Sequence, residues 1–166
     1  MIILSITNVK AFMSQLLVKD TFDHFLLSEA TITTYNTFQI DGLIHRDYYT
    51  EEQLAALSSQ EYSLWQTVRP FCFSLVKGSR TPSYMKLIFQ LPASITASLI
   101  DDNGLDFTPE DINGLFINIK YEHETLTCTT GSSLRIFTLD KSLDQAFEHY
   151  IRDLFVHCSI GFEDEV

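Results

Sequence analysis

The segment best suited to chemistry is Lys77-Gly78-Ser79-Arg80-Thr81. Two cations and two hydroxyls lie within this run, and its glycine can take the positive φ angles that let backbone N–H groups converge on one anion. The run lacks the G-x-x-x-x-G-K-[ST] spacing of a P-loop. It therefore predicts either a small anion site or an exposed hairpin tip.

Two other clusters carry reactive groups. Thr129-Thr130-Gly131-Ser132-Ser133 is rich in hydroxyls, but no G-x-S-x-G motif surrounds them and no histidine lies near in the sequence. In Glu122-His123-Glu124, neighbouring side chains on a strand point to opposite faces, so only the two glutamates could share an ion. We therefore predict no catalytic residue, no metal ligand and no cofactor, although some enzymatic activity stays an open alternative.

Positive charge is concentrated in the middle of the chain. Residues 62–100 contain no Asp or Glu, whereas the whole chain carries a net charge of −11. Two runs of strand character, Arg69–Lys77 and Tyr84–Leu91, flank the turn-like residues 78–82. The pattern predicts a central hairpin with a basic tip. The residues expected to bind an anion or a partner are Arg69, Lys77, Gly78, Ser79, Arg80 and Lys86.

Hydrophobic periodicity places the other elements around this hairpin. Alternating or continuous apolar runs predict strands, and apolar residues three and four apart predict helices with one buried stripe. The predicted strands are 2–6, 25–34, 37–44, 115–121, 125–130, 134–139 and 159–162, and the main predicted helices are 9–17, 51–57, 95–100 and 143–155.

This order of elements predicts an α+β fold in a single domain, residues 1–166. We expect a mainly antiparallel sheet with the helices packed on one face. The apolar patterns of residues 1–77 and 84–166 can be aligned as two similar β-α-β-β-(β)-α-β halves, so an internal duplication is one alternative and a chance similarity is the other.

The cysteines and the apolar runs bear on location. Cys72, Cys128 and Cys158 are odd in number and irregularly spaced, which favours reduced thiols in a cytosol. The apolar start, Met1–Ile6, is too short for a signal peptide, and no run approaches the ~18 apolar residues of a membrane span. We therefore expect a cytoplasmic protein that does not interact with membranes.

Four segments carry a resemblance to a known family, and they are Arg69-Pro70-Phe71-Cys72-Phe73, Lys77-Gly78-Ser79-Arg80-Thr81-Pro82, Cys128-Thr129-Thr130-Gly131-Ser132-Ser133 and Phe137-Thr138-Leu139-Asp140-Lys141. Together they resemble an uncharacterised family of short bacterial proteins over nearly the whole chain. That family has no known activity, so the resemblance implies a domain of unknown function.

Residues 89–100, 113–119 and 126–134 are similar to one domain of a DNA sliding clamp. That resemblance implies a fold of duplicated strand–helix–strand–strand–strand units, acidic overall with basic residues facing DNA. The chain departs from the clamp pattern at Gly131-Ser132-Ser133-Leu134-Arg135, and its length supplies about one of the several domains that a ring requires. The resemblance bears on fold more than on function.

These observations predict a non-enzymatic cytosolic interaction module. The basic hairpin would contact an acidic partner, either a protein or locally a nucleic acid, and self-association is a further possibility. A net charge of −11 argues against coating nucleic acid with the whole surface. The alternative is an enzyme or binder that acts on a small phosphorylated ligand at Lys77–Arg80.

Overall fold

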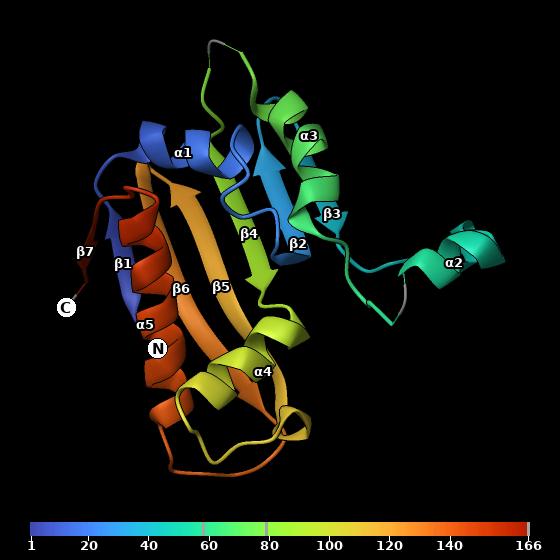
Figure 1. The fold of residues 1–166 in the computed structure, drawn as a ribbon. Coiled ribbons are helices and arrows are strands. Elements are labelled where there is room, and N and C mark those ends of the chain that lie inside the picture. The colour runs from blue at the N-terminus through green and yellow to red at the C-terminus, as the bar shows by residue number, and fades with distance from the viewer. Residues whose placement is uncertain (58, 79, 166) are drawn as a thin grey trace.

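The computed structural model describes residues 1–57, 59–78 and 80–165 (Figure 1). Its strands are β1 (Ile3–Ile6), β2 (Leu26–Thr33), β3 (Thr37–Asp41), β4 (Tyr84–Gln90), β5 (Ile112–Glu122), β6 (Thr125–Leu134) and β7 (Phe162–Asp164). Its helices are α1 (Val9–Leu17), α2 (Glu51–Leu57), α3 (Trp65–Val76), α4 (Ala93–Asp102) and α5 (Ser142–His157), with single turns η1 (Arg46–Tyr48) and η2 (Pro109–Asp111).

The strands form one antiparallel sheet in the order β3-β2-β4-β5-β6-β1-β7. The α+β class predicted from the sequence is therefore confirmed. The longest ladder joins β5 to β6, and β4 is an interior strand between β2 and β5.

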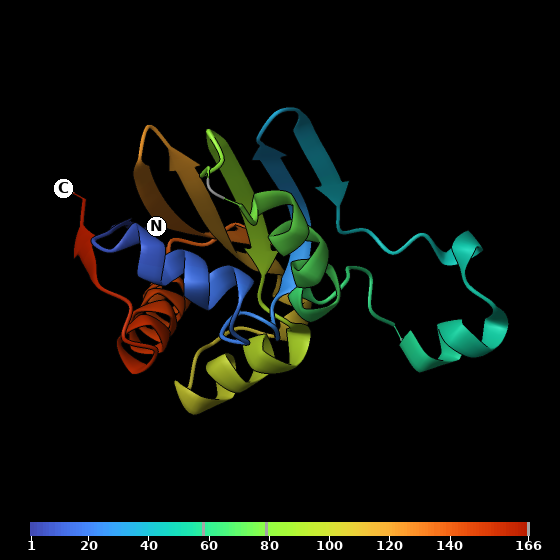
Figure 2. The same ribbon diagram turned by 90° about the horizontal axis from the view of Figure 1, so that it is seen from above.

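Helices α1, α3, α4 and α5 all cover the same face of the sheet (Figures 1 and 2). Alternate residues of β4 point into this layer, so Met85, Leu87 and Phe89 are fully buried while the residues between them face the other side. The ring of Phe89 lies 5.1 Å from Trp65 and 5.8 Å from Phe22, measured between centroids. Among the described residues, no helix is both long and apolar enough to cross a membrane.

Side-chain caps begin two of the helices, α1 and α2, where the sequence places them. The side chain of Asn8 accepts a hydrogen bond from the N–H of Ala11 and so caps α1. At α2, Thr50 and Gln53 exchange reciprocal bonds between side chain and backbone. Pro92 follows the end of β4 and occupies the N-cap position of α4, which has no side-chain cap.

The predicted strand Arg69–Lys77 is wrong, because residues 65–76 form helix α3 and the central hairpin does not exist. Trp65 and Cys72 form the buried stripe of α3, with Val68, Leu75 and Val76 partly buried beside them. Alternating apolar residues and a proline favoured a strand. The contacts of Trp65 outweigh that preference, since its indole N–H donates to the carbonyl oxygen of Leu16 at 2.9 Å.

The chain leaves the body after β3 and returns before α3 as a projecting arm, which we define as residues 45–57 and 59–62 (Figures 1 and 2). Helix α2, residues 51–57, contains no buried residue. The arm's root is fixed by Gly42, where a Cβ would lie 1.6 Å from the carbonyl oxygen of Leu27. Arg46 closes the arm by donating to the carbonyl oxygen of Gln60 at 3.1 Å.

The internal duplication is not confirmed by the strand pairing. In residues 84–166 the first strand, β4, pairs with the second, β5. In residues 1–77 the first strand, β1, instead pairs with β6 and β7. The predicted strand 134–139 is also wrong. Strand β6 continues to Leu134, and residues 135–141 form a loop.

Candidate functional site

Arg69, the first of the predicted binding residues, is already engaged. Its Nε and Nη2 donate to the two carboxylate oxygens of Asp23 at 2.7 and 2.9 Å, and its Nη1 donates to the carbonyl oxygen of Val18. The hydrogen bond to Asp23 raises the pKa of the guanidinium further. This bidentate pair ties α3 to the loop after α1, so Arg69 has a structural role.

Lys86 lies on the opposite face of the sheet from Arg69. Lys86 lies between the buried Met85 and Leu87 on β4. Its side chain therefore points outward from the face of the sheet that the helices do not cover. Its Nζ lies 3.6 Å from a carboxylate oxygen of Glu29. The four cations of the middle segment therefore do not share one surface.

The remaining predicted residues lie at the end of α3. Lys77 is exposed, and its N–H donates to the carbonyl oxygen of Phe73. Gly78 has a φ of 139°, in the range that favours glycine, and Arg80 is exposed. Ser79 lies outside the described residues. No described carboxylate forms an ion pair with Lys77 or Arg80.

Two of the three cysteine thiols, those of Cys72 and Cys128, are buried, and Cys158 is partly buried. Burial raises the pKa of the Cys72 thiol to about 12 and that of Cys128 further still. Both thiols therefore stay protonated near neutral pH. Within the described part of the chain, no three His, Cys, Asp or Glu side chains are grouped to hold a metal ion.

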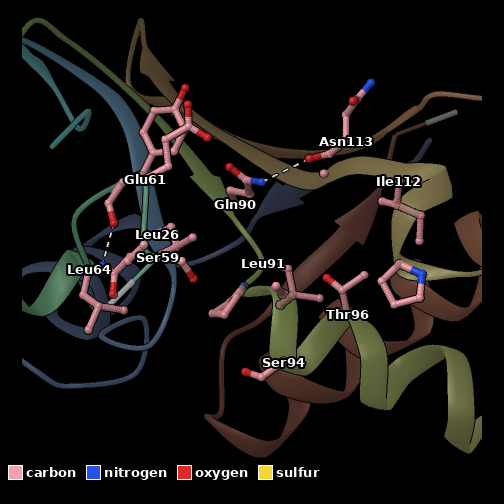
Figure 3. Close-up of a pocket in the computed structure, with 16 residues that line it drawn as sticks. Leu26, Ser59, Glu61, Leu64, Gln90, Leu91, Ser94, Thr96, Ile112 and Asn113 are labelled. Atoms are coloured by element: carbon pink, nitrogen blue, oxygen red, sulfur yellow. Dashed lines mark hydrogen bonds between the residues drawn. The ribbon is translucent and has the colours of Figure 1, made fainter. Parts of the chain in front are cut away.

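The structure contains a groove that none of these residues lines. It encloses about 440 Å³, within the roughly 300–1,000 Å³ range of ligand sites. Figure 3 shows Leu26 and Leu64 on one side, Ile112 and Asn113 on the other, and the end of β4 between them. Helix α4 lies along the bottom of this view and contributes Ser94 and Thr96.

The groove exists because β5 is longer than β4. Pairing between them stops at Gln90 and Phe116, and after one more bond, from the N–H of Leu91 to the carbonyl oxygen of Leu115, the chain turns into α4. Residues 112–114 of β5 pair with β6 on one side and border the groove on the other. We call these three residues the open edge of β5.

At this open edge the side chain of Gln90, rather than the backbone of a neighbouring strand, bonds to β5. The Nε2 of Gln90 donates to the carbonyl oxygen of Asn113 at 3.4 Å. Gly114 makes room for it, because a Cβ there would lie 2.8 Å from that nitrogen and 2.7 Å from the Phe116 ring. Asn113 itself sits at a β-bulge, and its side-chain oxygen accepts from Nε of Arg135 at 2.8 Å.

The groove's lining is suited to binding rather than to acid–base chemistry. Its polar side chains are mostly neutral amides and hydroxyls, and they alternate with leucine, isoleucine and proline. Glu61 and Tyr62 are the titratable side chains among the lining residues, and Glu61 is exposed. Such a surface can exchange hydrogen bonds with a peptide backbone and receive apolar side chains.

A second hollow lies on the other side of Pro92 and Ser94 and includes Asp20, Asp23 and His24. The Nε2 of His24 lies 3.3 Å from the hydroxyl of Tyr150, and burial lowers the pKa of the imidazole. Asp23 is already neutralised by Arg69. The hollow therefore holds one histidine–tyrosine contact and no complete set of catalytic groups among the described residues.

Reasoning from the sequence missed the groove. Gln90, Thr96, Asn113 and Gly114 carry no motif. The one available signal was Pro92, which ends a strand and begins a helix without a capping side chain. The length difference between β4 and β5 depends on register, which the local pattern did not specify.

Comparisons with known proteins give one match. No curated protein and no solved structure matches the chain. A family model described as a family of unknown function, DUF5721, matches residues 15–163. This agrees with the resemblance to an uncharacterised family, whereas the clamp resemblance stays a prediction. The chain belongs to the DUF5721 family, whose function is unknown.

Proposed function

We propose that this protein is a non-enzymatic module that binds an extended segment of a partner protein in the groove beside β5. The observation that carries the proposal is the open edge of β5, where the amide of Gln90 stands in place of a neighbouring strand. A segment that pairs with a sheet edge gains main-chain hydrogen bonds and places alternate side chains in adjacent pockets.

Two further features support a protein ligand. The groove offers apolar contacts at Leu26, Leu64 and Ile112, and its neutral amides suit backbone groups. The projecting arm forms one side of the groove through residues 59–62. An isolated helix as short as α2 is marginal in water, so a partner that covers the arm would stabilise it.

The proposal places this module in the cytoplasm. The three cysteines are free thiols in the described chain, which supports a reducing compartment.

The experiment is a selection from two libraries of short random peptides, one displayed with free C-termini and one with both ends closed. The variant Ser94→Trp fills the groove from an exposed position at the start of α4. Ser98→Trp is the matched control, because Ser98 is exposed on the same helix and does not line the groove. We expect peptides that bind the wild type and Ser98→Trp but not Ser94→Trp. Enrichment that is equal on all three proteins would refute the groove as the binding site.

A second candidate function concerns Lys77 and Arg80, which are exposed beside the positive φ of Gly78. These cations would contact an acidic partner, a nucleic acid or a small phosphorylated ligand. Steep salt dependence of binding to DNA, reduced by Lys77→Ala with Arg80→Ala, would favour a polyanion. A rise in melting temperature with one nucleotide would favour the small ligand.

A further inference from the structure

The start of α4 presents unused hydrogen-bond donors at the groove. Pro92 at the N-cap has no side-chain acceptor, and the first intrahelical bonds run from the N–H groups of Ile95 and Thr96 to the carbonyl oxygen of Pro92. The N–H groups of Ala93 and Ser94 donate to no acceptor among the described residues. Both residues line the groove. The helix is ten residues long, and its dipole favours negative charge at this end.

A second observation at the same place concerns Thr96. Its side chain is almost completely buried, with 7% of its surface exposed, and it lines the groove. Its hydroxyl has no hydrogen-bond partner among the described residues, whereas the hydroxyls of Ser74 and Ser98 bond back to their own helices. Figure 3 shows the hydroxyl oxygen of Thr96 pointing from α4 toward the hollow. The oxygen is not itself sealed inside the core, so it keeps access to the groove and is available to a ligand.

We infer that the start of α4 and the Thr96 hydroxyl bind the C-terminal carboxylate of the extended segment; this inference rests on the proposed function. The two N–H groups and the hydroxyl are all donors, and a carboxylate is an acceptor with two oxygens. A phosphate dianion fits less well, because no Lys or Arg is among the lining residues. The start of α4 borders the groove where β4 stops (Figure 3), so a segment that follows the open edge of β5 can place its terminus there.

One charge in the groove opposes a carboxylate. Glu61 belongs to the side formed by the arm, and its side chain is exposed, so water and salt screen its repulsion. Its presence gives a direct check on the sign of the bound charge: Glu61→Gln is expected to tighten binding of an acid slightly, most clearly at low salt, and to leave binding of the matching amide unchanged.

The test compares N-acetyl-leucine with N-acetyl-leucinamide, two probes that differ only in the terminal group. Each is titrated into isotope-labelled protein while the amide signals are followed by NMR. We expect the acid to shift the signals of Ala93 and Ser94 and to bind about tenfold tighter than the amide, the factor that one charge-assisted hydrogen bond supplies.

Variants of one side chain separate binding from folding. Thr96→Val keeps the shape and removes the hydroxyl, so it should weaken the preference for the acid severalfold while the two N–H groups remain, and Thr96→Ser should restore the preference. Ser98→Ala is the matched control on the same helix and should change neither affinity. Melting temperatures of all three variants establish that the fold is intact.

The outcomes separate this inference from the proposed function. If acid and amide shift the groove signals equally, the carboxylate site is overturned and the groove still binds peptide. If neither probe shifts them, or Thr96→Val retains the full preference for the acid, the carboxylate site is likewise overturned. In each case the peptide libraries decide the proposed function independently.

Discussion

Phe89 and Gln90 are neighbours on β4, yet they belong to opposite kinds of environment. Phe89 is fully buried against the rings of Phe22, Phe25 and Trp65. At the next residue, the side-chain amide of Gln90 donates to the carbonyl oxygen of Asn113, on the part of β5 that does not pair with β4. The sheet is therefore complete beneath the helices and incomplete at the end of β4. The difference separates the residues that hold the fold from those that are free to bind.

The largest expected effect comes from the complete side of this comparison. Phe89→Ala should lower the free energy of unfolding by about 3–5 kcal/mol, because it removes a ring from the centre of the aromatic cluster. Tyr48→Ala is the control, since Tyr48 on the arm is 84% exposed and should cost less than about 0.5 kcal/mol. Urea denaturation of both variants measures the contrast. Equal losses would mean that the arm packs on the body after all.

The second prediction compares Arg69 and Lys86, two cations that the sequence analysis placed on the same predicted hairpin. A double-mutant cycle of Arg69→Met with Asp23→Asn should give a coupling of about 1–3 kcal/mol, because the pair is bidentate and largely shielded from solvent. The same cycle for Lys86→Met with Glu29→Gln should give less than about 1 kcal/mol, because both side chains are more exposed.

Similar coupling energies in the two cycles would contradict the assignment of Arg69 to structure and Lys86 to an open surface. Chemical denaturation of the four single and two double variants supplies the values.

The smallest predicted effect concerns His24, at the border between the core and the hollow beside Pro92. Burial lowers its pKa in the folded protein below the ordinary value of about 6.5, although the nearby Asp23 acts the other way. The unfolded chain therefore binds more protons as the pH falls below that value, and stability should decrease there. His24→Gln should flatten this part of the profile.

His149→Gln is the control for this pH dependence, because the side chain of His149 is exposed on α5. Stability profiles between neutral and mildly acidic pH, compared for the wild type and both variants, test the point. A profile unchanged by His24→Gln would show that another group carries the dependence.

The sequence predicted those elements whose periodicity agrees with their environment. The stripe from Val9 to Leu17 and the long run after Ser142 both form helices, and alternation in β4 correctly predicted that Met85, Leu87 and Phe89 share a face. It failed at residues 65–76, where strand-forming residues make a helix because Trp65 and Cys72 pack into the core. Tertiary contacts outweighed local preference there.

The candidate site was beyond local patterns for a related reason. Single residues predicted the basic loop, and the structure leaves Lys77 and Arg80 exposed there. The groove instead depends on where β4 stops relative to β5. The Thr96 hydroxyl contributes to it only because the fold places α4 next to the open edge of β5. Neither property is encoded in the spacing of residues along the chain.

The most direct test of the central claim is to locate a selected peptide on the protein. A spin label attached to the peptide broadens the amide signals of nearby residues in the NMR spectrum. We predict broadening at Asn113 and Gly114, with the signals of Lys77 and Gly78 unaffected. Broadening centred on Lys77 and Gly78, with residues 112–114 unchanged, would contradict the groove as the binding site and favour the basic loop.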